Sequence, residues 1–246
     1  MQTLADIKPS ENLKVLVVGP PGTTKTCFGV GFPYPMLVLD FDNKVNSAAA
    51  WYSEDKERLK NIEVLNMSRR LDGTDPIAEM NKLITEELIP QQKAGLMKHK
   101  TLMIDSATTF SQAVLNHIIR TNPGVKRVVS AQGVQPSQSD YGILRREFAK
   151  LIPGILSLPM NVVMTAHIKV DRNDITGEII RYPILDGSFG QELPIYFEEV
   201  YVSMMKDGKP FAQTKNDPTH SFCRSQIPGL PAQVELKYEN LIKKYK

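Results

Sequence analysis

Hydrophobic residues in this chain gather in short runs, and between the runs they recur at every third or fourth position. The runs are rich in Val, Leu, Ile and Met, a composition typical of strands buried on both faces. They predict five strands, at residues 14–18, 36–41, 62–66, 101–104 and 161–166. The intervening segments predict helices at residues 24–30, 45–60, 107–120 and 141–157. Strands that alternate with helices in this way predict an α/β fold with a mostly parallel central sheet.

One further helix is marked by its own start and stop signals. Asp75 can cap this helix, and Pro76 then occupies the first helical position, where proline is favoured. Hydrophobic residues follow at helical spacing, at positions 77, 80, 83, 84 and 88. We expect the helix to end at Pro90, because proline lacks the backbone donor that a continuing helix needs. We also expect an interruption of the helix predicted at 141–157, at Pro153 and Gly154.

The pattern changes after residue 166, where strand-like segments are separated by turn residues instead of helices. Two hairpins are predicted there, from residues 168–171 with 178–184 and from 199–205 with 210–214. A terminal helix is predicted at 236–245, and residues 121–140, rich in Pro, Gly, Ser and Gln, predict a long exposed loop. We therefore expect a single domain, with a core of about 12–205 and a C-terminal hairpin and helix of about 206–246 that extend the sheet in antiparallel fashion.

Composition narrows the class of protein only a little. Of 246 residues, 41% are hydrophobic, which is enough for one large α/β domain. The net charge of +3 is mildly basic and gives no evidence of its own for a nucleic-acid partner. Two cysteines do not suggest a disulfide framework, the first twelve residues do not resemble a signal peptide, and no hydrophobic run could cross a bilayer. We expect a cytoplasmic protein with no membrane partner.

The segment directly after the first strand reads Gly-Pro-Pro-Gly-Thr-Thr-Lys-Thr, at positions 19–26. Gly19 and Gly22 can adopt backbone angles that turn N–H groups inward to form an anion nest. The start of the next helix adds unpaired N–H groups and the positive end of its dipole. Lys25 would reach the outer phosphates of a nucleotide, and the hydroxyl of Thr26 would bind Mg²⁺. The predicted ATP-binding residues are Gly19, Pro20, Pro21, Gly22, Thr23, Thr24, Lys25, Thr26 and Cys27.

One position departs from the usual phosphate-binding pattern, because Thr24 stands where a second glycine is expected. Its branched side chain should crowd the loop where the phosphates come closest, so we expect weaker affinity or slower turnover. The alternative is that the whole segment is an ordinary Pro/Gly turn between a strand and a helix. Cys27, inside the predicted helix, is expected to be a buried thiol.

Two further strands end in carboxylates that could complete the site. Asp105 follows the fourth strand and could hold Mg²⁺, although a lone Asp in that place is often only a helix cap. Asp40 and Asp42 end the second strand and are expected on the same face, because strand residues two apart point the same way. Asp42 is the candidate that orients the attacking water, with Asp40 in support. The alternative for this pair is a turn formed with Asn43.

The remaining candidates are less constrained by the pattern alone. His167 closes the fifth strand and could sense the γ-phosphate and pass its state to the next segment, with Thr165 as a second polar candidate on that face. A histidine at a strand end is also often just a satisfied polar residue. Lys215 and Arg224 could reach a phosphate bound to a neighbouring subunit, but the residues alone favour solvated charge.

Several of these motifs, in this order, resemble one known group. They are the loop at 19–26, Leu-Val-Leu-Asp-Phe-Asp, Leu-Met-Ile-Asp-Ser, Asp140-Tyr141-Gly142, Val-Val-Met-Thr-Ala-His, Leu185-Asp186-Gly187 and the late Lys215 and Arg224. Together they resemble the phage-encoded RecA-like ATPases, specifically the Sak-four-like single-strand annealing recombinases and the related phage nucleotide-binding proteins.

This resemblance implies a RecA-like P-loop core that binds ATP and Mg²⁺ and assembles side by side, with the nucleotide between subunits of a homo-oligomer. It implies that Lys215 and Arg224 act in trans and that Asp42 stands where the family carries its catalytic carboxylate, usually Glu. It supports His167 as the sensor. Family DNA-binding loops would place four cations on single-stranded DNA: Lys126, Arg127, Lys169 and Arg172.

Two functions remain open on this basis. The first is an ATP-dependent recombination or replication protein that binds single-stranded DNA in the cytoplasm of a bacterial host. The second is a nucleotide-gated loader or scaffold for a replication or single-strand-binding partner, with little hydrolysis. A small-molecule kinase shares the phosphate loop, but the late hairpins and the cation pair argue mildly against it.

Overall fold

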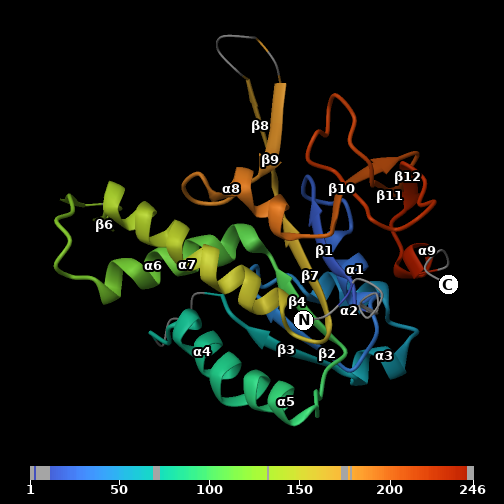
Figure 1. Cartoon of the computed structure of the whole chain (residues 1–246), viewed down its shortest axis with the longest axis horizontal. Coiled ribbons are helices and arrows are strands. Elements are labelled where there is room, and N and C mark those ends of the chain that lie inside the picture. The colour runs from blue at the N-terminus through green and yellow to red at the C-terminus, as the bar shows by residue number, and fades with distance from the viewer. Residues whose placement is uncertain are drawn as a thin grey trace.

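A computed structural model describes residues 3, 12–68, 73–131, 133–172, 177 and 179–242. Its centre is an eight-stranded sheet in the order β12-β11-β10-β1-β7-β4-β2-β3 (Figure 1). The six strands from β10 to β3 in this order pair in parallel, and β11 and β12 pair antiparallel beyond β10. This confirms the predicted α/β fold with a mostly parallel sheet that antiparallel strands extend. The strands are β1 (Lys14–Val18), β2 (Met36–Asp40), β3 (Ile62–Asn66), β4 (Thr101–Asp105), β7 (Asn161–Ala166), β10 (Glu199–Lys206), β11 (Lys209–Gln213) and β12 (Gln233–Glu235).

Alternate residues of the buried strands feed two separate hydrophobic cores, one on each face of the sheet. Leu16 and Val18 of β1 belong to the core beneath α4, α6 and α7, whereas Val15 and Val17 belong to the core beneath α1, α2 and α9. The molecule is therefore a three-layer sandwich, as Figure 1 shows. The helices are α1 (Lys25–Val30), α2 (Asn46–Trp51), α3 (Lys56–Lys60), α4 (Pro76–Lys82), α5 (Ile89–Ala94), α6 (Ala107–Thr121), α7 (Gln138–Leu156), α8 (Phe189–Glu192) and α9 (Tyr238–Ile242).

The helices differ from the prediction in three places. The segment predicted as one helix at 45–60 is two short helices, α2 and α3. The helix expected to end at Pro90 instead continues through a π-helical turn, Leu83–Leu88, into α5 and ends at Gly95. Pro90 lies in the first turn of α5, where the missing backbone donor is tolerated. Helix α7 runs through Pro153 without the expected interruption.

The predicted long loop at 121–140 is more ordered than its composition suggested. It contains a small hairpin of β5 (Val129–Ser130) and β6 (Gly133–Val134), and α7 begins within it. The helix start is fixed by a capping box, in which Ser137 and Asp140 exchange hydrogen bonds. Composition indicated the exposed turns here but not the cap that shortens the loop.

Both predicted hairpins are present, and the first stands apart from the sheet. β8 (Ile168–Arg172) and β9 (Ile179–Pro183) pair only with each other and project from the body of the molecule (Figure 1). Residues 173–176 of its predicted turn, residue 178 of its predicted second strand, and 243–245 of the predicted terminal helix lie outside the described residues. Among the described helices, none combines the length and the apolar character that crossing a bilayer would require.

Candidate active site

Two glycines shape the turn between β1 and α1, each for its own reason. Gly19 donates its N–H to the carbonyl of Ala166 at 3.1 Å. A Cβ on Gly19 would lie 2.6 Å from the carbonyl oxygen of Ser203, so a side chain has no room there. Gly22 has a φ of 76°, which favours glycine. The turn is thus held between β7 and β10 and leads back to the N-terminus of α1.

Thr24, the departure from the usual pattern, has left-handed backbone angles, with φ 59° and ψ 21°. Glycine adopts this conformation freely, whereas a β-branched residue is strained in it. The Thr24 hydroxyl is buried and has no hydrogen-bond partner among the described residues. The sequence predicted side-chain crowding at this position, and the geometry adds strain of the backbone.

Lys25 lies at the first position of α1 and is 8% exposed. Its ammonium donates to the carbonyls of Gly19 at 2.9 Å and Pro20 at 2.7 Å. An ammonium has three donors, so one is left for a ligand oxygen. Burial lowers the pKa of Lys25 to about 8, while the negative charges of Asp105 and Asp42 act against that fall. The positive charge therefore sits in a poorly hydrated place, where it would be worth most to a phosphate.

The other predicted loop residues form a scaffold rather than a set of contacts. Pro20 and Pro21 are exposed, and the Thr23 hydroxyl donates to the Pro20 carbonyl at 2.8 Å. The Ser203 hydroxyl donates to the carbonyl of Thr23 and ties the loop to β10. Cys27 is buried, and burial raises the pKa of its thiol, in line with an inert side chain.

Thr26 and Asp105 come together, as the sequence placed them. The Thr26 hydroxyl donates to Oδ2 of Asp105 at 2.7 Å, and the Thr165 hydroxyl donates to Oδ1. Asp105 is 3% exposed, and burial raises the pKa of its carboxyl, while the two hydroxyls act against that rise. A buried carboxylate with a hydroxyl beside it is suited to a hard divalent cation, whose charge would offset the cost of burial.

Asp42 lies beside Asp105 because the main chain joins them. The N–H groups of Phe41 and Asp42 both donate to the carbonyl of Asp105, at 2.6 and 3.1 Å. The hydroxyls of Ser106 (3.0 Å) and Thr109 donate to Oδ1 of Asp42. Burial acts to raise the pKa of Asp42, but these bonds and the nearby His167 outweigh it and lower the pKa to about 2.

Asp40 does not share the place of Asp42, and this corrects the expectation that the two carboxylates converge on one ligand. Its two oxygens accept hydrogen bonds from the N–H groups of Lys44 at 3.2 Å and Val45 at 3.1 Å. Asp40 therefore fixes the turn after β2, which is the kind of role the alternative interpretation gave to this pair.

His167 links Asp42 to the projecting hairpin. Its Nε2 lies 3.7 Å from Oδ2 of Asp42, whereas its Nδ1 is buried with no partner among the described residues. Its N–H donates to the Thr108 hydroxyl at 3.0 Å, and its carbonyl accepts from Ile184 at 2.8 Å, at the base of β8 and β9. The side chain is thus near Asp42, while the main chain is bonded to Thr108 and to the base of the hairpin; the role of sensor stays a prediction.

Several contacts were missed because they are made by hydroxyls rather than charged groups. Ser106 directly precedes α6, and Thr108 and Thr109 lie in its first turn; their hydroxyls bind Asp42 or the backbone of His167. A visible signal was the cluster of hydroxyl residues directly after the predicted metal ligand, Asp-Ser-Ala-Thr-Thr at 105–109. Ser203 gave no such signal, since it lies in an unremarkable strand far along the chain.

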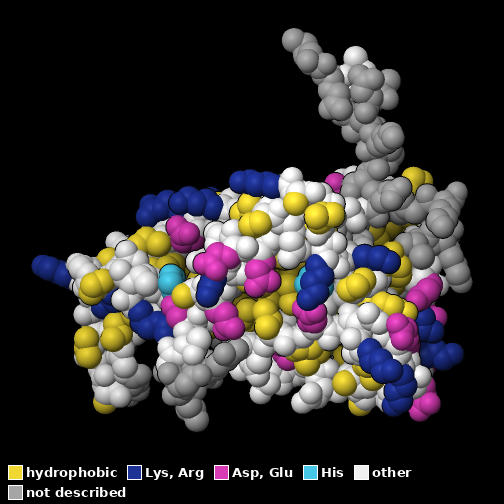
Figure 2. Space-filling model, turned by 90° about the horizontal axis from the view of Figure 1, so that it is seen from below, with side chains coloured by type: hydrophobic (Ala, Val, Ile, Leu, Met, Phe, Trp, Pro, Cys, Tyr) yellow, Lys and Arg dark blue, Asp and Glu magenta, His cyan; other side chains and the backbone are white. Residues whose placement is uncertain are grey.

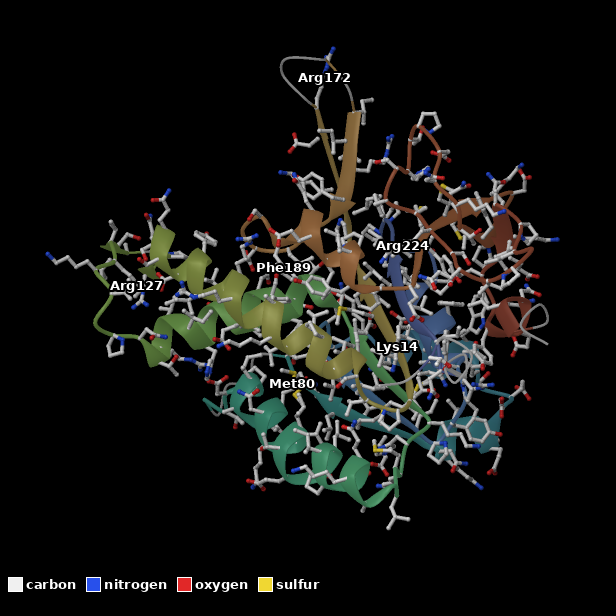
Figure 3. The ribbon with its side chains drawn as sticks, in the orientation of Figure 1. Lys14, Met80, Arg127, Arg172, Phe189 and Arg224 are labelled. Carbon is white, nitrogen blue, oxygen red and sulfur yellow. The ribbon has the colours of Figure 1, made fainter. Side chains whose placement is uncertain are left out.

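Two predicted cations are engaged within the chain itself. Arg127 makes a two-bond ion pair with Asp140, at 2.9 and 2.7 Å, and the two side chains are 6% and 0% exposed. This corrects its assignment as an exposed phosphate contact, because Arg127 instead closes the loop between α6 and α7. The guanidinium of Arg224 donates to the carbonyls at positions 194, 195 and 197, so it faces its own chain (Figure 3).

The other predicted cations are exposed and scattered. Lys126 and Lys215 are exposed on different loops, and Arg172 lies near the tip of the β8–β9 hairpin (Figure 3). Lys169 is exposed on β8, with its ammonium 3.1 Å from Asp171. Seen from below Figure 1, Lys and Arg side chains intermingle with Asp and Glu (Figure 2). The described side chains of that face do not carry the single-sign charge that marks a nucleic-acid footprint.

Comparison with known proteins agrees with a phosphate-binding loop at this edge of the sheet. The family model described as an AAA domain matches residues 11–221, a span that holds the loop and every carboxylate described above. The chain belongs to the AAA domain family.

Two other comparisons do not narrow the family of this AAA domain further. A comparison with curated proteins finds no match. Among solved structures, the crystal structure of the RadB recombinase is similar over 81% of this chain and 79% of that chain, with 12% identity and a TM-score of 0.45. A likeness at that TM-score carries no argument here.

Proposed function

We propose that this AAA domain is a RecA-like, Mg²⁺-dependent ATPase that acts on single-stranded DNA in phage recombination or replication. The observation that carries the ATPase part is the contact between Thr26 and Asp105 beside the N-terminus of α1. The two side chains come from distant parts of the chain and meet where the Lys25 ammonium lies. A strand, a turn, a cation and a hydroxyl–carboxylate pair in this arrangement suit a triphosphate with its metal.

The residues fit ATP and Mg²⁺ as follows. The backbone from Gly19 to Cys27 would surround the phosphates, Lys25 would neutralise their charge, and Thr26 and Asp105 would hold the metal. The described residues contain no group of three His, Cys, Asp or Glu side chains that could hold a metal unaided. Mg²⁺ is commonly bound by one or two protein ligands together with substrate phosphates and water, so it needs no such group. When bound, the metal supplies charge that offsets the negative charge of the phosphates.

Hydrolysis would depend on Asp42 as an orienting group. With a pKa of about 2 its carboxylate is ionised at neutral pH and is a weak proton acceptor. Ser106 and Thr109 hold one of its oxygens, which leaves the other, facing His167, to align a water molecule. Slow turnover is the expected consequence, because the favourable pKa of a general base lies near the working pH.

The DNA-binding and oligomeric parts of the proposal are supported by the family resemblance and by exposed cations. Lys126, Lys169 and Arg172 lie on the two segments that project from the sheet, and Lys215 is free to face a neighbouring copy. Arg224 would act on a neighbour's phosphate only after leaving its own carbonyls, so Lys215 is the better trans-acting candidate.

The second candidate function is a nucleotide-gated loader or scaffold for a replication or single-strand-binding partner. Two observations favour it: the strained backbone of Thr24 and the low pKa of Asp42, both of which favour ATP that is held rather than rapidly hydrolysed. Its partner contacts would change with nucleotide state.

One assay separates these functions and tests the first. Phosphate release would be measured in Mg²⁺ buffer with and without single-stranded DNA, for the parent protein and for Lys25→Ala. DNA-stimulated release that the Lys25 variant lacks supports the recombination protein. ATP binding with no release, and ATP-dependent capture of a partner without DNA, favours the scaffold. No binding of any nucleoside triphosphate by folded protein contradicts both.

A further inference from the structure

A cleft of about 1030 Å³ is lined by Phe41, which precedes Asp42, and by Thr109, whose hydroxyl donates to Asp42. One wall is a single face of α6, formed by Thr109, Gln112, Asn116 and Arg120, which recur at helical spacing. The lining also includes Val134 of the β5–β6 hairpin. Its volume lies just above the range of about 300–1,000 Å³ for small-ligand sites, so it could receive part of a chain rather than one small molecule.

The chemistry of this cleft is polar and nearly neutral. Arg120 is the one charged side chain among the described residues that line it, and part of its charge is balanced by Asp75 at 2.9 Å. Gln112 and Asn116 are exposed, and no other described side chain hydrogen-bonds to their amides. Each amide offers both donors and acceptors, the combination that reads the edge of a nucleobase. Phe41 and Met67 also line the cleft, but both side chains are almost wholly buried, so the polar groups of α6 are the ones available to a ligand.

The hydroxyl oxygen of Thr109 links the cleft to Asp42. Thr109 lines the cleft, and its hydroxyl donates its single hydrogen to Asp42. The same oxygen keeps lone pairs that can accept from an amino group in the cleft. A bond accepted there would polarise the hydroxyl and strengthen the bond it donates. Occupancy of the cleft would therefore be felt by the carboxylate that orients water.

We propose that this cleft receives bases of single-stranded DNA, with Gln112 and Asn116 on base edges and Arg120 on a phosphate, and that its occupancy stimulates hydrolysis through Thr109. This rests on the proposed function and adds to it a binding site that the exposed cations do not form. Nucleic acid is favoured over a peptide because the described lining offers two free amides and a guanidinium and contains no carboxylate. The neighbouring loop also carries the exposed Lys126.

The test uses the full chain with Mg²⁺ and ATP, and a fluorescein-labelled single-stranded oligodeoxynucleotide of mixed sequence. Gln112→Ala and Asn116→Ala change exposed helix positions, where alanine is well tolerated. Each should weaken binding, measured by anisotropy, about tenfold, as expected for loss of a two-bond contact with a base. Both should lose DNA-stimulated phosphate release while keeping the rate without DNA. Gln92→Ala on α5 and Asn81→Ala on α4 are matched controls, exposed helix amides outside the cleft.

A second measurement fixes the location. A strand that contains 5-bromodeoxyuridine would be photocrosslinked and the product mapped by mass spectrometry, with crosslinks expected on α6. Crosslinks confined to β8–β9, with normal binding by both α6 variants, would overturn the cleft while leaving the proposed function in place. Failure of the parent protein to bind the strand would overturn the DNA function itself. Displacement of the labelled strand by an unlabelled peptide that binds in the cleft would also overturn the assignment.

Discussion

Asp105 and Asp42 lie side by side at the centre of the site, but their surroundings shift their pKa values in opposite directions. Around Asp105, burial prevails and its pKa is raised. Around Asp42, hydroxyls and His167 prevail and its pKa is lowered to about 2. A pair of acids whose surroundings move their pKa values apart is typical of sites in which each acid has its own task. A bound cation would offset the cost of ionising the buried Asp105, which we propose as a metal ligand, whereas Asp42 is already ionised and held by hydrogen bonds.

The largest expected effect comes from removing the charge on the metal side. Asp105→Asn should reduce Mg²⁺-dependent hydrolysis by about 10³-fold or more, because the cation loses its protein carboxylate. Single-turnover phosphate release across a range of Mg²⁺ concentrations measures this. Turnover at the parent rate would show that Asp105 is only a buried structural acid, and the contrast between a metal-binding and a water-orienting carboxylate would be wrong.

Asp42→Asn should lower kcat by about 10²-fold while ATP affinity is retained, since only the orientation of water is lost. Calorimetry gives the affinity, and phosphate release gives kcat. The parent protein should show no loss of rate from Asp42 between pH 5 and pH 8, because its pKa of about 2 lies well below that range. Asp40→Asn is the matched control, and equal losses from both variants would argue that Asp42 is no more than part of the turn.

ATP affinity should fall as pH rises above about 8, because Lys25 then loses its proton and its charge. The sign follows from the lowered pKa: the ammonium form, which attracts phosphate, prevails only below that pKa. In the limit the affinity decreases about tenfold for each pH unit. Calorimetric titrations from pH 7 to pH 9.5, with Lys25→Arg as a variant that stays charged, measure it. A parallel decline in the arginine variant would assign the effect to another group.

Thr24→Gly should have the smallest effect and the opposite sign. Relief of a left-handed backbone angle at a β-branched residue is worth about 1 kcal/mol, so nucleotide affinity should improve about fivefold. Thr24→Ala is the informative partner, because it removes the branch but keeps a Cβ and hence most of the backbone strain. Unchanged or weaker affinity in the glycine variant would mean that the loop tolerates threonine at no cost.

Much of this site could be predicted from sequence, because its residues lie at or just after the ends of strands. Buried strands are easily recognised, and the carboxyl ends of parallel strands meet at one edge, so Lys25, Thr26 and Asp105 were expected to be neighbours. The separation of Asp40 from Asp42 could not be predicted, since it depends on which backbone N–H groups the following turn presents. The same holds for Arg127, whose burial against Asp140 depends on a helix cap inside a segment whose composition suggested only a loop.

The single carbonyl of Asp105 that receives two N–H groups from the end of β2 has a consequence for protein engineering. These bonds fix the distance between the main chains of Asp42 and Asp105. Replacing either side chain therefore changes how far its carboxylate extends but not the spacing of the two backbones. A longer glutamate introduced at position 42 would carry its carboxylate past the hydroxyls of Ser106 and Thr109. Under the proposed function, faster hydrolysis would therefore require rebuilding the first turn of α6 together with that residue.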